Sequence, residues 1–119
     1  MKSRPTEFKR SICPIACALD IFGDKWTLLI IRDLFAGKKT YSEFNRSPEN
    51  IPTNILAARL KLLLEHEILE KVAYQQNPVR YEYLLTDKGK EIGHIIGAIA
   101  QWGEKHIPGT QALMKPVIS

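Results

Sequence analysis

The chain has little cysteine, no long apolar run and no glycine-rich phosphate loop. Two cysteines are too few for the disulfide framework of a small secreted domain, so core packing must supply the stability. Apolar runs such as Leu28–Ile31 are far shorter than the roughly 20 residues that cross a bilayer, and the polar start MKSRPTEFKRS is unlike a signal peptide. We therefore expect a cytoplasmic protein with no membrane segment.

Catalytic and metal-binding patterns are missing as well. His66, His94 and His106 lie far apart, and none stands four residues from another histidine or a cysteine. The sequence contains no nucleophile elbow and no carboxylate pair that could divide acid and base roles. We expect no catalytic residue, no metal and no cofactor, and hence no enzyme.

The sequence has the length of one domain and a mild excess of positive charge. Its 119 residues are 45% hydrophobic and 25% charged, as in ordinary soluble globular proteins. Seventeen Lys and Arg against thirteen Asp and Glu give a net charge of +4 and a pI near 9.1. This balance permits an anionic partner without requiring one.

Helical signals dominate the first third of the chain. An apolar-periodic stretch opens at Pro14 and stops at Gly23, as a helix with a glycine after its last turn does. Asp24 then has the position of an N-cap for a second helix that ends at Gly37.

Two further helices are predicted in the middle of the chain. Thr40 and Glu43 have the spacing of a capping box, which predicts a short helix from Tyr41 to the break at Ser47–Pro48. A longer helix follows over Thr53–His66, with one apolar stripe formed by Leu56, Leu60 and Leu63.

The period then changes from helix to strand. Residues 69–74 and 80–85 alternate apolar or aromatic with polar side chains, which predicts a β-hairpin with a polar tip. Thr86 is placed to cap one last helix that runs to His106.

This order of elements is that of a winged helix-turn-helix. We expect an α+β, mainly helical fold with an additional N-terminal helix and a C-terminal dimerisation helix. Small side chains allow a helix to approach the major groove, polar and basic ones contact bases or phosphates, and a narrow minor groove attracts an inserted Arg. The predicted DNA-binding residues are Thr53, Asn54, Ala57, Ala58 and Lys61 on the helix, Lys38, Lys39 and Arg46 around the short helix, and Arg80 on the hairpin.

The sequence also resembles a known family. The segments CPIACALDIFGDKWTLLIIRDLFAGKKTYSEFNR, IPTNILAARLKLLLEHEILEKV, NPVRYEYLLTDKG and WGEKH are similar to the HxlR-type transcriptional regulators, bacterial winged-helix proteins related to the MarR group. The resemblance implies a homodimer that binds inverted-repeat DNA, with Thr53–His66 as recognition helix and Leu69–Leu85 as wing. The similarity covers a DNA-binding domain over 13–106. The residues outside it are expected to form a basic N-terminal arm over 1–12 and a flexible tail over 107–119.

A partner subunit is the natural cover for the apolar stripe of the last helix. The rest of this small core offers too little surface to bury both that stripe and the first helix. The predicted dimerisation residues are Ile15, Leu19, Ile92, Ile95, Ile96, Ile99 and Trp102.

Other interpretations concern Cys13 and Arg59. The helix N-terminus and nearby Arg10 favour the thiolate form of Cys13, which would suit a sensor of electrophiles or oxidants. The alternative is that Cys13 is only a packing residue. Arg59 lies between the core stripe and the groove face, where it either contacts DNA or pairs with a carboxylate such as Glu43. The alternatives to a DNA-binding regulator are a protein- or RNA-binding adaptor and a thiol-based redox sensor; a small-molecule effector stays unidentified.

Overall fold

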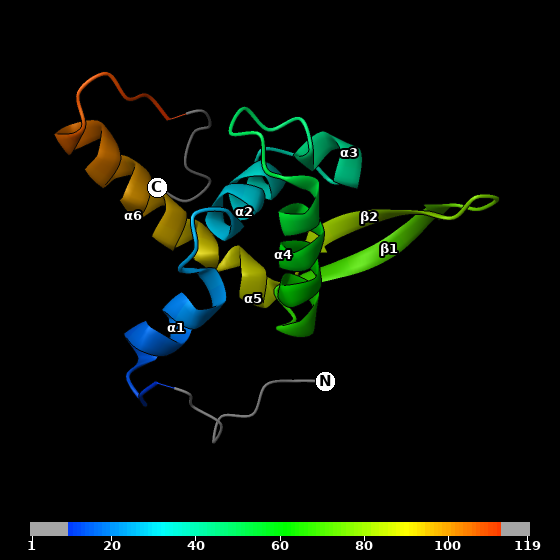
Figure 1. Ribbon diagram of the computed structural model, residues 1–119, viewed down its shortest axis with the longest axis horizontal. Helices are drawn as coiled ribbons and strands as arrows, with labels where there is room; N and C mark the ends of the chain where they lie inside the picture. Colours follow the sequence, from blue (N-terminus) through cyan, green and yellow to red (C-terminus); the bar gives the residue numbers. More distant parts are fainter. Residues whose placement is uncertain (1–9, 113–119) are drawn as a thin grey trace.

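The computed structural model describes residues 10–112 and places the predicted elements in the predicted order (Figure 1). The described part of the chain contains six helices and one two-stranded sheet. The elements are α1 (Pro14–Phe22), α2 (Thr27–Phe35), α3 (Tyr41–Phe44), α4 (Thr53–Glu65), β1 (Leu69–Gln75), β2 (Arg80–Leu85), α5 (Asp87–Lys90) and α6 (Ile92–His106). None of these helices is long and apolar enough to cross a membrane.

Local capping signals set most helix starts. Pro14 opens α1, and the side chains of Thr40 and Glu43 form the predicted reciprocal capping box of α3. The second helix begins later than predicted, with Trp26 and not Asp24 at the N-cap position of α2. The Asp24 carboxylate still accepts the N–H groups of Trp26 and Thr27, both at 3.0 Å, and so caps the turn that leads into the helix. The predicted break at Ser47–Pro48 comes slightly earlier, since α3 ends at Phe44.

The core lies where α2, α3 and α4 meet the base of the hairpin. The apolar stripe predicted for α4 is confirmed, because Leu56, Leu60 and Leu63 are buried. The other buried apolar side chains are Ile30, Ile31, Phe44, Ile51, Ile68, Leu69 and Ile92. This core fixes the rotation of α4 and so decides which of its side chains face solvent.

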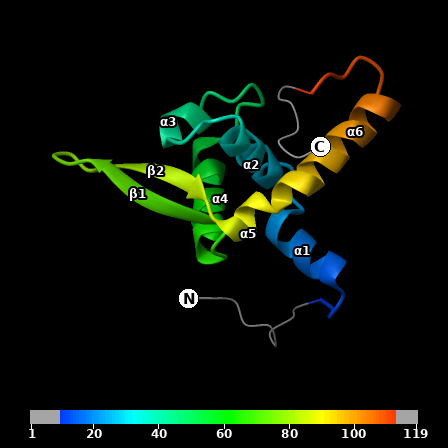
Figure 2. The same ribbon diagram turned by 180° about the vertical axis from the view of Figure 1, so that it is seen from behind.

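The hairpin projects from the body of the protein, on the opposite side from α6 (Figures 1 and 2). Its strands are antiparallel, and the register shifts between Ala73 and Gln75. At the base, the Tyr83 N–H donates to the Lys39 carbonyl at 2.7 Å. Beyond Leu69, every residue of β1 is exposed. The hairpin is therefore anchored only near its base.

The prediction of one continuous last helix was wrong. Thr86 caps α5, but helical structure is interrupted at Glu91 before α6 starts at Ile92. Glycines at 89 and 93 flank the interruption, and glycine weakens a helix interior. Gly89 also lies so close to the core that a Cβ there would be 2.3 Å from the Ile68 carbonyl oxygen.

The two predicted terminal segments fall mostly outside the described residues. Of the basic arm over 1–12 only residues 10–12 are described, and of the flexible tail over 107–119 only 107–112. The described start of the tail folds back on α6, because the Thr110 hydroxyl lies 3.1 Å from the Gly103 carbonyl and the Ala112 N–H donates to Glu104.

Candidate nucleic-acid interface

One face of α4 is small, polar and basic. With its leucine stripe buried, the helix exposes all five predicted groove residues, namely Thr53, Asn54, Ala57, Ala58 and Lys61. The exposed side chains of this helix include no acidic residue before Glu65. A helix with two alanines at its centre and an amide and an ammonium around them fits closely against a groove lined by acceptors and phosphates.

Contacts from two other elements hold α4 in place. The Tyr41 hydroxyl donates to the Thr53 carbonyl at 3.0 Å, which ties α3 to the first turn of α4. On the following turns, an Arg59 guanidinium nitrogen lies 3.7 Å from the Asp24 carboxylate. Partial burial acts to raise the pKa of Asp24, but hydrogen bonds from Thr27 and Trp26 and the Arg59 charge lower it overall, so the capping carboxylate stays ionised.

Arg59 is paired with a carboxylate, one of the two roles left open for it, but the partner is Asp24 and the suggested Glu43 was wrong. Glu43 closes the capping box instead, accepting from the backbone N–H groups of Lys39 at 2.7 Å and Thr40 at 3.1 Å. Those N–H groups lower the pKa of Glu43. Asp24 takes its place as the partner of Arg59, a pairing 35 residues apart that no local pattern indicates.

The basic residues around α3 are not equivalent. Lys39 and Arg46 are exposed, whereas Lys38 is half-buried with its ammonium 3.8 Å from the Asp33 carboxylate. Asp33 is itself buried, bonded to the Ser47 hydroxyl and to Arg32. The charge of Lys38 is therefore partly neutralised within the fold, which leaves Lys39 and Arg46 as the freer cations.

The hairpin presents two cations. Arg80 is exposed at the start of β2, opposite Gln75, and forms no ion pair with any other residue between 10 and 112. Sequence reasoning missed Lys71, whose ammonium lies 4.5 Å from the centre of the Tyr81 ring. The two residues stand diagonally across the strand pair, where side chains of this length meet. The pairing of the two strands is the signal that could have identified Lys71, because it sets Lys71 diagonally opposite Tyr81.

The apolar face on α1 and α6 differs from the predicted one by three residues. Ile15, Leu19, Ile95, Ile99 and Trp102 are exposed, Ile15 by 69% and Trp102 by 61%. Ile92 is only 7% exposed and lies in the core, and Ile96 packs against that core, so both help to hold α6 on its own chain. Ile12, at 82% exposure, extends the face and was not predicted.

Cys13 is exposed at the N-terminus of α1. The backbone N–H groups of Ala16 and Ile15 lower the pKa of its thiol, which favours the thiolate. The expected contribution of Arg10 is not found, because that guanidinium pairs with Asp20 at 2.8 Å. Cys17 is half-buried, with its sulfur 3.4 Å from the Ser11 carbonyl oxygen.

No group of three His, Cys, Asp or Glu side chains within residues 10–112 is placed to hold a metal ion. The exposed cations and amides of α4, of the region around α3 and of the hairpin suit the recognition of a polyanion by hydrogen bonds and charge.

Comparisons with known proteins point to a single group. The model of a family described as HxlR-like helix-turn-helix matches residues 21–111. An uncharacterized HTH-type transcriptional regulator of Mycobacterium tuberculosis is 36% identical over 91 residues, which make up 76% of this chain and 57% of that protein. The chain thus spans little more than half the length of that relative.

Solved structures show the same arrangement of elements. PA1607, described as a transcription factor, has a TM-score of 0.77 and 40% identity, covering 88% of this chain and 74% of its own. The redox regulator HypR in its reduced form has a TM-score of 0.72 and 31% identity, covering 78% and 92%. HypR is also solved in an oxidized form, with a TM-score of 0.71.

Proposed function

The chain belongs to the HxlR-like helix-turn-helix family, and we propose that it is a homodimeric transcription regulator that binds inverted-repeat duplex DNA. The family resemblance and the winged helix-turn-helix fold predicted from the sequence are confirmed, and the matched relatives are transcription regulators. In this proposal α4 enters the major groove and Arg80 of the hairpin enters the adjacent minor groove.

The observation that carries the proposal is the exposed face of α4. The core contacts, Tyr41 and Arg59 fix the helix in one orientation, and that orientation turns Asn54, Ala58 and Lys61 to solvent. A rigid helix with a small basic face is preorganised for a groove, because little side-chain entropy is lost on binding.

A dimer supplies the second half-site. α1 buries none of its residues, and both α1 and α6 lie on the side of the protein away from the hairpin (Figure 2). Exposed apolar side chains of these two helices supply the contact in this proposal. An inverted repeat requires a two-fold axis that brings the two copies of α4 to one side of the dimer. The charged variant Ile95→Glu should sediment as a monomer where wild type is a dimer; a monomeric wild type at micromolar concentration would contradict this part of the proposal.

Selection of bound fragments from a random duplex pool tests the DNA proposal directly. We expect an enriched palindrome whose affinity falls steeply as salt rises, because bound cations release counterions from the phosphates. Enrichment of no sequence, together with salt-insensitive binding of a protein or an RNA, would instead identify an adaptor module.

A thiol sensor is the second candidate function. Cys13 is exposed with a lowered pKa, and the similar protein HypR is a redox regulator solved in two oxidation forms. Since α1 belongs to the apolar face, modification of Cys13 would alter the dimer and with it the spacing of the two α4 helices.

A further inference from the structure

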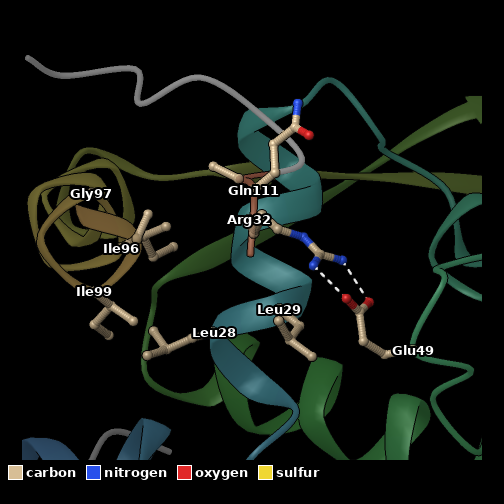
Figure 3. Close-up of a pocket in the computed structure, with 10 residues that line it drawn as sticks. Leu28, Leu29, Arg32, Glu49, Ile96, Gly97, Ile99 and Gln111 are labelled. Atoms are coloured by element: carbon tan, nitrogen blue, oxygen red, sulfur yellow. Dashed lines mark hydrogen bonds and ion pairs between the residues drawn. The ribbon is translucent and has the colours of Figure 1, made fainter. Parts of the chain in front are cut away.

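A pocket of about 340 Å³ lies between α2 and α6 (Figure 3). Leu28 and Leu29 of α2 form one wall, and Ile96 and Ala100 of α6 form the other. Gly97, which is buried, is part of the second wall. The volume is at the lower end of the range of small-molecule sites.

The charged groups at the rim of the pocket neutralise one another. The Arg32 guanidinium donates two hydrogen bonds of 2.8 Å to the two oxygens of Glu49, as Figure 3 shows, and two more to Asp33. With its donors satisfied in this way, Arg32 offers little to an incoming anion, which would lose its hydration without gaining a free cation. The rim therefore favours an uncharged ligand.

The segment after α6 closes one side of the pocket. Gln111 and Ala112 belong to its lining. They are held there by two contacts with the end of α6, the Ala112 N–H to Glu104 at 2.8 Å and the Thr110 hydroxyl to the Gly103 carbonyl at 3.1 Å. Two packed helices and this hydrogen-bonded segment line three sides of the pocket, which stays partly open to solvent where the exposed Ile99 forms its edge.

We propose that this pocket binds a small, uncharged, largely apolar molecule of one or two rings and that its occupancy changes the affinity for DNA. The second part rests on the proposed function. Two features connect the pocket to the DNA-binding elements. Ile99 belongs both to the pocket lining and to the apolar face, and Arg32 joins α2 to Glu49 in the connection that leads into α4.

A ligand seated here therefore separates or tightens α2 against α6. The relative position of the two α4 helices in a dimer depends on that packing, so a ligand that prefers one packing shifts the equilibrium between DNA-competent and incompetent arrangements.

The binding test uses 1-naphthol as probe and the 1-naphthoate anion, of the same ring system, as its charged comparison. Calorimetric titration of the wild-type chain should show saturable binding of 1-naphthol at one site per chain and association of the anion at least about tenfold weaker. Equal or tighter binding of the anion, or no saturable binding of 1-naphthol at millimolar concentration, overturns the proposal.

Two variants locate the bound probe. Ala100→Phe fills the pocket and should lower the association constant about tenfold or more, whereas Gln101→Phe adds the same ring on the exposed side of α6 and should change it by less than about twofold. Glu104→Ala removes the acceptor that holds Ala112 and should weaken binding without touching the core. If the two phenylalanine variants and Glu104→Ala all bind like wild type, the probe sits elsewhere and the site is wrong.

The coupling between the pocket and DNA binding is measured as the affinity for the duplex enriched from the random pool, with and without saturating 1-naphthol. A change in DNA affinity of about threefold or more in wild type, absent in Ala100→Phe, is expected. Probe binding with unchanged DNA affinity overturns the coupling, while probe binding in a protein that binds no duplex contradicts the proposed function and leaves the site standing. If 1-naphthol does not bind and Ala100→Phe sediments as a monomer beside a dimeric Gln101→Phe, the pocket is part of the subunit contact and the proposal fails.

Discussion

Arg59 of α4 is paired with Asp24, the carboxylate that also caps the start of α2. One side chain thus fixes both the beginning of a core helix and the orientation of the helix assigned to the DNA groove. The buried hydroxyl of Thr27 donates to the same carboxylate at 2.6 Å and holds it between the two helices.

Asp24→Ala should lower the free energy of unfolding by about 1–2 kcal/mol, the typical cost of losing a helix cap. The loss arises because two backbone N–H groups and Thr27 lose their acceptor. Urea denaturation measures it, and Asp20→Ala is the matched control, since that carboxylate pairs with Arg10 at the surface and should cost little. Equal losses in both variants would remove the special role of Asp24.

Asn54→Ala and Lys61→Ala should leave the melting temperature nearly unchanged, because both side chains are exposed. Each should weaken binding of the selected duplex, by about 1–3 kcal/mol where a base contact is lost, and Lys61→Ala should reduce the salt slope by about one if it contacts a phosphate. Lys105→Ala serves as the control, because it removes the same charge from α6, away from the proposed DNA face. Large destabilisation with intact binding would place these residues in the core.

Arg80→Ala should weaken binding more on A·T-rich than on G·C-rich flanks, because a narrow minor groove concentrates negative potential. Titration of wild type and variant on both duplexes measures the difference. An equal loss on both leaves a phosphate contact only, and no loss removes Arg80 from the interface. Lys71→Ala, tested in parallel, separates the two cations of the hairpin.

Cys13 should be alkylated faster than Cys17 in the folded protein at neutral pH. Its thiol is exposed and its pKa is lowered by the N–H groups of Ala16 and Ile15, whereas Cys17 is half-buried. Timed alkylation read by mass spectrometry at each site decides the matter, and Cys13→Ser should bind DNA normally yet ignore oxidants. If both thiols react only after denaturant is added, Cys13 is a packing residue.

The ion pair between Arg32 and Glu49 should make the free energy of unfolding fall at low pH. Hydrogen bonds from Arg32 hold the pKa of Glu49 below its ordinary value of 4.5, so the unfolded chain takes up this proton more readily than the folded one. The stabilisation from the ionised Glu49 is complete above pH 4.5 and is lost as the pH falls through the lowered pKa of Glu49 in the folded protein.

Glu49→Gln measures that dependence. Urea denaturation at about pH 7 and about pH 3.5 should show a stability deficit relative to wild type that shrinks at the lower pH. Glu65→Gln, an exposed position on α4, should show no such change. A deficit of equal size at both pH values would mean that the Glu49 charge is not what stabilises the pair.

Signals within a few residues of one another predicted most of the fold. The capping box of Thr40 and Glu43, the proline at the start of α1 and the leucine stripe of α4 are each readable over one or two helical turns. The exposed groove face followed from the same stripe, because burying one side of a helix exposes the other.

Long-range contacts account for what the sequence did not predict. Ile92 belongs to the same helical stripe as Ile95, yet only tertiary packing decides that the first is buried in its own chain and the second is exposed. The partner of Arg59 was misassigned for the same reason, since Asp24 and Glu43 are equally plausible carboxylates until the helices are placed. Gly89, two residues before the break at Glu91, lies so close to the Ile68 carbonyl oxygen that a Cβ has no room, and this long-range approach is not visible in the periodicity of the sequence.

The hairpin meets the rest of the protein at its base, where the Tyr83 N–H is bonded to the Lys39 carbonyl, and its outer strand residues are exposed. Residues added or removed at the tip therefore change reach without disturbing the buried side chains under α4. Evolution can therefore lengthen or shorten the hairpin, or change its charged residues, at little cost in stability, while α4 stays unchanged. If the chain binds DNA as proposed, the flanks of an operator and its centre are then read by two parts of the chain that are free to evolve at different rates.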